Sequence, residues 1–568
     1  MERFWLKNYP AGVPADVDVT QYSSLVQLMD ESFAKFAKRD AYAFMDRHYT
    51  FADIDRYSAA FGAWLQQRGL APGARVAIMM PNVIQYPIAV AAILRAGCVV
   101  VNVNPLYTPR ELEHQLKDSG AEAIVILENF CTTLQQVVAR TQVKHVVVAS
   151  IGDMLGFPKG IIVNLMLRRV KKVVPEFSLP GHVKFVEALD QGARGKLAPV
   201  KLGPSDVAFL QYTGGTTGVS KGATLTHRNL VANVLQLEAW TLPSLNDASR
   251  GPVPEQYVYV CALPLYHVFA LTVNCLGGMR LGALNVLIAN PRDLTGFVKE
   301  LDKYKFNVIP GVNTLYNTLA ENPEFRRLDF SSLRIANGGG MAVQKAVSEK
   351  WLALTGVPII EGYGLSETSP VATCNPVNST EYSGNIGLPV SSTEIAILDD
   401  DGQPVPLGQA GEIAIRGPQV MAGYWQRPDE TAKVMTPDGF FKSGDIGIMD
   451  ERGYTKIVDR KKDMIIVSGF NVYPNEIEAV VASHPGVLEC AAIGIVDERS
   501  GEAVKVFVVR KDPTLTEADV MAHCKQQLTG YKKPKFIEFR DDLPKSNVGK
   551  ILRRELRDLK PQVQAKSA

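Results

Sequence analysis

The sequence predicts an α/β protein with a β-rich part and a smaller α+β domain at its C-terminal end. From Arg75 onward short apolar strands alternate with helical stretches, and past Ser383 the chain turns to β-rich pieces separated by Gly, Pro and Asp. A compact unit of helix and strand follows the charged joint at residues 459–463. Such alternation is typical of layered α/β folds. With 568 residues, the chain is long enough for two or more hydrophobic cores.

Each expected element rests on a local pattern. Apolar runs bounded by turn residues predict strands, and a longer mixed stretch between two such runs predicts a helix. The β-rich strands past Ser383 suggest a barrel-like subdomain. The expected strands are 76–79, 123–127, 207–210, 394–398, 412–416 and 491–495, and the expected helices are 87–94 and 474–483.

Composition and charge exclude several classes of function. The formal net charge is +2, which gives no global reason to expect a nucleic-acid partner. The seven cysteines show no CxxC pair and no metal-ligand spacing, as expected for a reducing cytoplasm. The chain start is not typical of a secretory signal, and the apolar runs end well short of the roughly 18 residues of a membrane span.

One segment, residues 156–174, combines apolar side chains with the cations Arg168, Arg169, Lys171 and Lys172. A basic apolar helix is able to lie on an anionic bilayer surface. The same pattern is equally typical of an ordinary amphipathic surface helix. The sequence leaves both interpretations open.

The most specific motif spans residues 212–222 and follows an apolar strand. Its glycines let backbone amides approach phosphate oxygens, while hydroxyls and Lys221 add donors and charge. Because Lys221 follows Ser220 and precedes Gly222, the motif is not a Walker loop. It predicts a phosphate-binding loop and disfavours a kinase or a P-loop ATPase.

A second motif, residues 361–367, follows the apolar run 357–360. An aromatic ring held between glycines is suited to stack on a nucleobase, and a carboxylate is suited to bind Mg²⁺. Taken alone, the motif also fits a turn before a capped helix.

Together the two motifs resemble those of the adenylate-forming superfamily of acyl-CoA synthetases, luciferases and peptide-synthetase adenylation domains. Further matches follow in the family's order: 264–267, 338–340, 411–412, 423–424, 443–445, 459–460 and 544–550. The opening residues 5–10 and the stretches 102–107 and 438–462 resemble bacterial long-chain fatty-acid–CoA ligases over essentially the whole chain.

This resemblance implies a large N-terminal domain of layered α/β subdomains and a distorted β-barrel, followed by a small mobile C-terminal α+β domain. The implied domains are 1–459, which carries ATP and the fatty acid, and 463–568, which carries a catalytic lysine, with a hinge at 460–462. The implied substrates are ATP, a long-chain fatty acid and coenzyme A, with Mg²⁺ as cofactor.

The resemblance also assigns roles to single residues. Tyr363 would stack on adenine, Asp445 and Arg460 would bind the ribose, and Thr213 and Glu367 would share Mg²⁺. The implied ATP-binding residues are Thr213, Gly214, Gly215, Thr216, Thr217, Gly218, Lys221, Gly339, Gly340, Glu361, Gly362, Tyr363, Gly364, Ser366, Asp445 and Arg460.

Four residues are expected to be catalytic: Thr213, Glu367, His267 and Lys550. His267 would position the substrate carboxylate, and Lys550 would offset the charge that builds as the carboxylate attacks phosphorus. Lys462 matches the hinge of the family. Ser468, Gly469 and Phe470 would line the coenzyme A channel.

Residues proposed to wall the acyl site are His267, Val268, Leu271, Gly311, Val312, Met341 and Pro370. The predicted function is ATP-dependent activation of a long-chain fatty acid as its coenzyme A thioester, which prepares it for uptake and degradation. The alternatives are a medium-chain or aryl acid–CoA ligase, an acyl-AMP ligase or peptide-synthetase adenylation domain that delivers to a carrier protein, and a non-enzymatic membrane-binding module. Peripheral contact with the inner membrane surface and a homodimer are further expectations.

Overall fold

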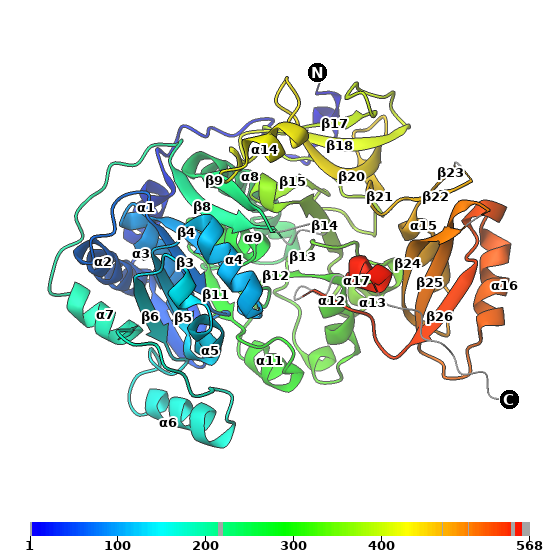
Figure 1. Cartoon of the computed structure of the whole chain (residues 1–568). Helices are drawn as coiled ribbons and strands as arrows, with labels where there is room; N and C mark the ends of the chain where they lie inside the picture. The colour runs from blue at the N-terminus through cyan, green and yellow to red at the C-terminus, as the bar shows by residue number, and fades with distance from the viewer. Residues whose placement is uncertain (1–2, 214–219, 469, 498, 547–550, 559–568) are drawn as a thin grey trace. The chain divides into compact units, whose positions relative to one another are not determined.

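The computed structural model describes residues 3–213, 220–468, 470–497, 499–546 and 551–558. The chain divides into two compact units. Unit 1 consists of residues 1–394 and 415–441, and unit 2 consists of residues 395–414 and 442–568. Figure 1 follows the chain from the blue N-terminal helices to the orange and red C-terminal strands.

Unit 1 contains an eight-stranded sheet in its described part, in the order β19-β9-β8-β4-β3-β5-β6-β7. Strands β4, β3, β5, β6 and β8 run parallel to their neighbours in this group, whereas β8 and β9 form an antiparallel pair. The strands are β3 Arg75–Met79, β4 Val99–Asn102, β5 Ala123–Leu127, β6 His145–Ala149, β7 Val183–Lys184, β8 Val207–Tyr212, β9 Gly222–Thr226 and β19 Gly423–Tyr424.

A second sheet of unit 1 has nine described strands in the order β16-β15-β14-β13-β12-β10-β11-β1-β2. Its centre, from β14 to β1, is parallel. The strands are β1 Asp40–Phe44, β2 Arg47–Thr50, β10 Val258–Cys261, β11 Leu284–Leu287, β12 Val308–Gly311, β13 Ile335–Gly338, β14 Ile359–Gly364, β15 Val371–Cys374 and β16 Leu388–Pro389.

Helices cover both sheets, and several begin with a capping side chain. Thr50 caps α2 with Asp53, and Thr108 caps α4 with Glu111, each in a reciprocal capping box. The helices of unit 1 are α1 Leu25–Lys35, α2 Phe51–Gln67, α3 Gln85–Arg95, α4 Pro109–Ser119, α5 Cys131–Gln135, α6 Lys159–Leu165, α7 Phe185–Gly192, α8 His227–Leu245, α9 Val268–Ala270, α10 Gly278–Arg280, α11 Leu294–Leu301, α12 Asn313–Glu321, α13 Lys345–Thr355 and α14 Pro428–Val434.

Each sheet of unit 1 contributes to a dense apolar core. Strand β5 is buried along its whole length, as its unbroken apolar sequence requires for a parallel strand covered on both faces. Beside the nine-stranded sheet, Trp351 packs edge-on against Tyr316 with ring centroids 4.7 Å apart. These rigid cores hold the strand ends that carry the candidate site.

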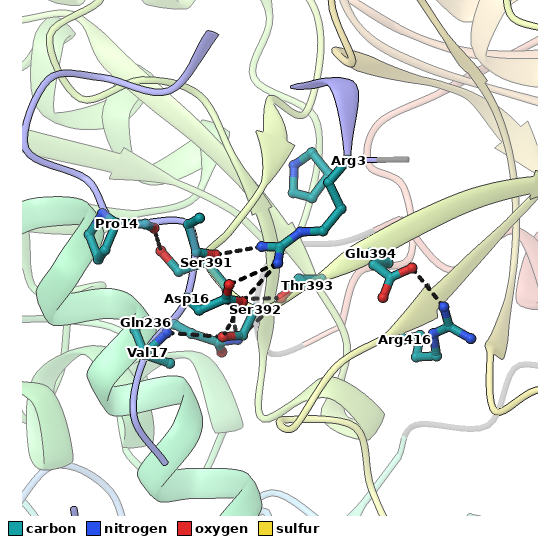
Figure 2. A network of polar contacts seen from close by, with 12 residues as sticks. Arg3, Pro14, Asp16, Val17, Gln236, Ser391, Ser392, Thr393, Glu394 and Arg416 are labelled. Atoms are coloured by element: carbon teal, nitrogen blue, oxygen red, sulfur yellow. Dashed lines mark hydrogen bonds and ion pairs between the residues drawn. The ribbon is translucent and has the colours of Figure 1, made fainter. Parts of the chain in front are cut away.

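The first residues of the chain are fastened to unit 1 (Figure 2). Arg3 forms an ion pair with Asp16 at 2.8 Å, and the hydroxyl of Ser391 donates to the carbonyl of Pro14 at 2.6 Å. The backbone N–H of Val17 donates to the hydroxyl of Ser392 at 3.0 Å. The opening segment is therefore an integral part of this unit.

Unit 2 holds two smaller sheets. The β-rich stretch forms a sheet of four described strands in the order β17-β18-β20-β21; residues 394, 415, 416 and 441 of these strands are counted with unit 1. The last part is α+β, with the order β23-β22-β25-β24 and β26 paired to β25. The elements are β17 Glu394–Leu398, β18 Ala410–Arg416, β20 Phe441–Met449, β21 Thr455–Arg460, β22 Ile465–Val467, β23 Phe470–Val472, α15 Pro474–Ala482, β24 Val487–Asp497, β25 Gly501–Arg510, α16 Glu517–Gln527, β26 Phe536–Arg540 and α17 Arg553–Asp558.

The fold class expected from the sequence is confirmed, and each of the eight strands and helices expected above corresponds to an observed element. The hinge at residues 460–462 stays a prediction. No described helix has both the length and the apolar character needed to cross a bilayer. All seven cysteines are buried and free of disulfides.

Candidate active site

Hydrogen bonds join the two ends of the predicted phosphate-binding loop. Thr213 directly follows β8, and its N–H donates to the carbonyl of Lys221 at 2.9 Å. The hydroxyl of Ser220 donates back to the carbonyl of Thr213 at 2.5 Å. A side chain on Gly222 would press on the ring of Tyr212, with its Cβ 3.1 Å from that ring, so glycine keeps the two strands close. Thr213 and Lys221 are thus fixed side by side.

The carboxylate of Glu367 lies against this pair of strands. Glu367 belongs to the short helix η8 Ser366–Thr368 and is buried. The hydroxyl of Tyr424 donates to its Oε1 at 2.8 Å. Because Tyr424 pairs with Ala223 of β9, it connects the second motif to the strand that leaves the phosphate-binding loop. Burial and the nearby carboxylate of Glu367 raise the pKa of Tyr424, which keeps the hydroxyl protonated as a donor.

Lys221 extends the same line of contacts. Its ammonium forms an ion pair with Glu430 at the start of α14 and lies 5.1 Å from the centroid of the Tyr424 ring. Lys221 and Lys433 lower the pKa of Glu430 to about 2. The motif at residues 423–424 was recognised from the sequence, but the contacts of Tyr424 and Glu430 were not. Only the pairing of β19 with β9 brings these residues to the loop.

A second group of predicted residues meets at one edge of the nine-stranded sheet. Parallel pairing sets Gly311 opposite Gly338, and Gly338 opposite Glu361. The residues that follow these parallel pairs therefore share the carboxyl edge, where α/β sheets commonly bind ligands. They are Val312, Gly339, Gly340, Gly362, Tyr363 and Gly364.

Glycine is required at two of these positions. A Cβ on Gly364 would lie 1.7 Å from the carbonyl oxygen of Pro370, and Gly340 has a φ of +75°. A side chain at position 364 would collide with the backbone, and the left-handed φ at position 340 favours glycine.

Glu361 is buried at this edge. The N–H of Val343 donates to one of its oxygens at 3.0 Å. Burial raises the pKa of the carboxyl to about 7, although this hydrogen bond acts in the opposite direction. Glu361 is therefore easily neutralised near neutral pH.

Buried amides position the segment that carries His267. Gln211, two residues before Thr213, donates to the carbonyl of Tyr266 at 2.9 Å. Asn82 donates to the carbonyl of Leu263 at 2.8 Å and accepts from the N–H of Leu265. These amides were missed by sequence reasoning, because a polar residue in an apolar strand or helix end gives no signal of its partner.

His267 itself caps α9, where its Nδ1 accepts from the N–H of Phe269 at 3.3 Å. The ring of Phe269 fills the place of a side chain on Gly339, 3.0 Å from its ideal Cβ. The structure thus links the histidine segment to both the phosphate-binding loop and the glycine edge.

The residues predicted to wall the acyl site are mostly buried in unit 1. Val268 and Leu271 have almost no exposed surface, Val312 and Pro370 are buried, and Met341 is half-buried. The space beside Gly311 is filled by the ring of Tyr316, 2.9 Å from an ideal Cβ. Their contact with an acyl chain stays a prediction.

The two predicted ribose ligands form a pair in unit 2. Asp445 and Arg460 stand opposite each other on β20 and β21, with Nε and Oδ1 3.2 Å apart. Nearby, burial and the charge of Arg460 lower the pKa of Lys462 to about 8. A nucleotide sugar would therefore meet a carboxylate whose orientation is already fixed.

The candidate coenzyme A residues also lie in unit 2. The N–H of Ser468 donates to the carbonyl of Ser500 at 2.7 Å. Phe470 is exposed and stacks on Tyr531 with centroids 4.6 Å apart. Seven predicted site residues lie outside the described part of the chain: Gly214, Gly215, Thr216, Thr217, Gly218, Gly469 and Lys550.

Comparison with known proteins places this geometry in a family. Residues 29–425 match the model of the AMP-binding enzyme family, and residues 476–550 match that of the AMP-binding enzyme C-terminal domain. The chain belongs to the AMP-binding enzyme family, which confirms the resemblance inferred from the motifs.

Curated relatives cover nearly the whole chain. A long-chain-fatty-acid–CoA ligase of Escherichia coli O6:H1 is 56% identical, with 98% of each chain covered. A long-chain-fatty-acid–CoA ligase of Bacillus subtilis is 38% identical, with 97% of each covered. Among solved structures, ATP-bound MatB from Rhodopseudomonas palustris is 28% identical, with a TM-score of 0.78 over 94% of this chain and 98% of that one.

Proposed function

We propose that this protein joins a long-chain fatty acid to coenzyme A at the expense of ATP. A carboxylate oxygen attacks the α-phosphorus and pyrophosphate leaves, which gives an acyl-adenylate. The sulfur of coenzyme A then attacks the acyl carbon and AMP leaves. The observation that carries the proposal is the 56% identity over 98% of the chain to a ligase of that name.

The contacts of unit 1 support the first half-reaction. Lys221 and the hydrogen-bonded ends of the loop supply charge and donors for the polyphosphate. The half-exposed ring of Tyr363 lies at the sheet edge where adenine would stack. His267, held by its own helix cap, is suited to position the acid rather than to remove a proton.

Mg²⁺ fits the oxygen donors at this site. Thr213 offers a hydroxyl and Glu367 a buried carboxylate that the hydroxyl of Tyr424 orients. Among the described residues no group of three or more His, Cys, Asp or Glu side chains is arranged as a metal site. Two protein ligands suit Mg²⁺, which usually keeps waters and substrate phosphates as its other ligands. When bound, the ion would neutralise charge on the polyphosphate.

Glu367→Gln tests this assignment. The amide keeps an oxygen but loses the charge, so the Mg²⁺ concentration for half-maximal rate should rise at least about tenfold, and saturating Mg²⁺ should restore part of the rate. Glu321→Gln, an exposed carboxylate of the same unit, is the control. An unchanged metal dependence in Glu367→Gln would remove this residue from the metal site.

The remaining predicted residues belong to the C-terminal domain, and we expect this domain to serve both half-reactions in turn. Lys550 would serve adenylation, and residues 468–470 would line the coenzyme A channel after a rotation about Lys462. Lys550→Ala should slow adenylation by about 100-fold to 1000-fold, as for other charge-stabilising groups. The same variant, given acyl-adenylate and coenzyme A, should form thioester at nearly the normal rate. Equal loss in both steps would contradict the division of roles.

Three finer expectations belong to the same proposal. Function in the cytoplasm, contact with the inner membrane surface and assembly as a homodimer are each compatible with this activity. Sedimentation velocity tests the dimer directly.

The activity itself is tested by measuring AMP release with fatty acids and with amino acids, each with and without coenzyme A. We expect release that needs both a fatty acid and coenzyme A and that rises along a series from acetate to palmitate. Each buried methylene is worth about 0.8 kcal/mol, so a fitting site discriminates strongly by length. Equal efficiency on acetate and palmitate would contradict long-chain specificity.

A further inference from the structure

The segment of residues 157–173 concentrates apolar surface on unit 1. Helix α6 within it lies at the lower left of Figure 1, apart from the two sheets. Phe157 is 87% exposed and Val170 is 75% exposed. We define the apolar surface as Phe157, Ile161, Ile162, Leu165, Val170 and Val173, all of them exposed. An exposed group of this kind marks an interaction site rather than scattered surface residues.

The arrangement follows helical periodicity. Ile161, Ile162 and Leu165 are spaced i, i+1 and i+4, so they lie on one face of α6. Gly160 and Val163 lie on the other face and are buried. An ideal Cβ on Gly160 would come within 2.3 Å of the carbonyl oxygen of Gly152, so glycine lets α6 sit directly on the preceding turn.

Two of the five cations in residues 156–174 fasten the segment to the rest of unit 1. Lys159 pairs with Asp46 at 2.9 Å. Arg168 pairs with the buried Glu128 at 2.6 Å and also donates to Ser150 at 3.0 Å. The sequence suggested Arg168 as a lipid contact, but this pairing assigns it a structural role, because without Arg168 the buried carboxylate would lose its partner.

The other three cations, Arg169, Lys171 and Lys172, are exposed. Within the described ranges no carboxylate forms an ion pair with any of them. Residues 156–174 contain no Asp or Glu. The outward surface is therefore apolar with an adjoining uniform positive charge.

We propose that this apolar surface docks on an anionic lipid bilayer. The six apolar side chains enter the boundary between headgroups and acyl chains, while Arg169, Lys171 and Lys172 meet the headgroup phosphates. A second copy of the chain is the less suitable occupant. A symmetric contact through the same face would set these cations against each other without a carboxylate of the segment to compensate.

The experiment measures binding of the full chain to vesicles by sedimentation, without ATP, acid or coenzyme A, so its result is independent of the proposed activity. Vesicles of phosphatidylethanolamine with phosphatidylglycerol are compared with vesicles of phosphatidylcholine alone. The charge variant is Arg169→Gln, Lys171→Gln and Lys172→Gln. The apolar variant is Ile161→Gln, Ile162→Gln and Leu165→Gln. The matched control neutralises three exposed cations elsewhere on unit 1: Lys201→Gln, Lys305→Gln and Arg326→Gln.

The natural chain should bind the anionic vesicles more tightly than the neutral ones. The charge variant should bind the anionic vesicles about fivefold more weakly for each charge removed, on the order of 100-fold in all. The apolar variant should lose at least about tenfold on the anionic vesicles. The control should bind like the natural chain, and all variants should keep an unchanged cooperative unfolding transition.

Three results would overturn the proposal. In the first, the charge variant binds anionic vesicles as well as the natural chain does. In the second, the control loses as much binding as the charge variant, which would indicate attraction spread over the whole surface. In the third, the apolar variant keeps its vesicle binding but changes its self-association in sedimentation velocity, which would assign the apolar surface to a contact between copies.

Discussion

The hydroxyl of Tyr424 donates a hydrogen bond to Oε1 of Glu367 at 2.8 Å, across 57 positions of sequence. The ammonium of Lys221 lies beside the ring of the same tyrosine. One side chain therefore orients the candidate metal ligand and contacts the lysine of the phosphate-binding loop. We infer that Tyr424 is a positioning residue for both.

Tyr424→Phe should remove this orientation while keeping the ring. A hydrogen bond to a charged group contributes roughly 1.5 to 3 kcal/mol, so adenylation should slow by about 10-fold to 100-fold. The Mg²⁺ concentration for half-maximal rate should also rise, which a purely structural role would not cause. Single-turnover release of pyrophosphate measures both. Tyr304→Phe, which removes a hydroxyl elsewhere in unit 1, is the control, and a normal metal dependence in Tyr424→Phe would count against positioning.

The ion pair between Lys221 and Glu430 predicts competition with ATP. Glu430 and an ATP phosphate would compete for the ammonium of Lys221, so Glu430→Gln should lower the KM for ATP by about twofold to fivefold, the range of a partly exposed ion pair. Lys221→Met should raise the same KM by at least about tenfold, because a charge-assisted contact is lost. Lys433→Gln, which removes the other partner of Glu430, serves as the comparison. If Glu430→Gln raised the KM as Lys221→Met does, Glu430 would instead hold the lysine in place for ATP.

Burial of Glu361 predicts a dependence of stability on pH. The pKa of its carboxyl is about 7 in the folded chain, against 4.5 for an ordinary glutamate such as that of the unfolded chain. The folded state therefore holds this proton more tightly than the unfolded state does. The resulting stabilisation is complete below pH 4.5 and is lost as the pH rises through 7, a change of about 3 kcal/mol. Glu361→Gln removes this dependence.

Urea unfolding of the full chain, followed at pH 5 and pH 8, measures the effect. From pH 5 to pH 8 the free energy of unfolding of the natural chain should fall relative to that of Glu361→Gln. If the free energy of unfolding changed with pH by the same amount in both proteins, the carboxyl of Glu361 would not be held neutral by the fold.

Much of the fold followed from local pattern, for physical reasons. The run 123–127 is apolar without interruption and short, as is typical of a parallel strand covered on both faces; β5 has these bounds. The change of texture past Ser383 precedes β17, the first strand of the four-stranded sheet, by about ten residues. The sheet of four described strands, by contrast, depends on pairings between segments that no local pattern specifies.

Candidate site residues could be predicted from the sequence where they stand together in one contiguous motif. The loop at 212–222 and the motif at 361–367 identify themselves by glycine, hydroxyl and carboxylate spacing. Tyr424, Gln211 and Asn82 do not, because each acts through a partner far along the chain. The pairing of Arg168 with Glu128 gave no signal for the same reason, since Glu128 lies 40 positions away.

The route through an acyl-adenylate is tested most directly by following the oxygen atoms of the acid. Palmitate carrying ¹⁸O in both carboxyl positions is incubated with ATP, Mg²⁺ and coenzyme A, and the products are separated and weighed by mass spectrometry. Attack of the carboxylate on the α-phosphorus predicts one ¹⁸O in each AMP and one in each palmitoyl thioester. Label in inorganic phosphate or pyrophosphate, or AMP without label, would contradict the account.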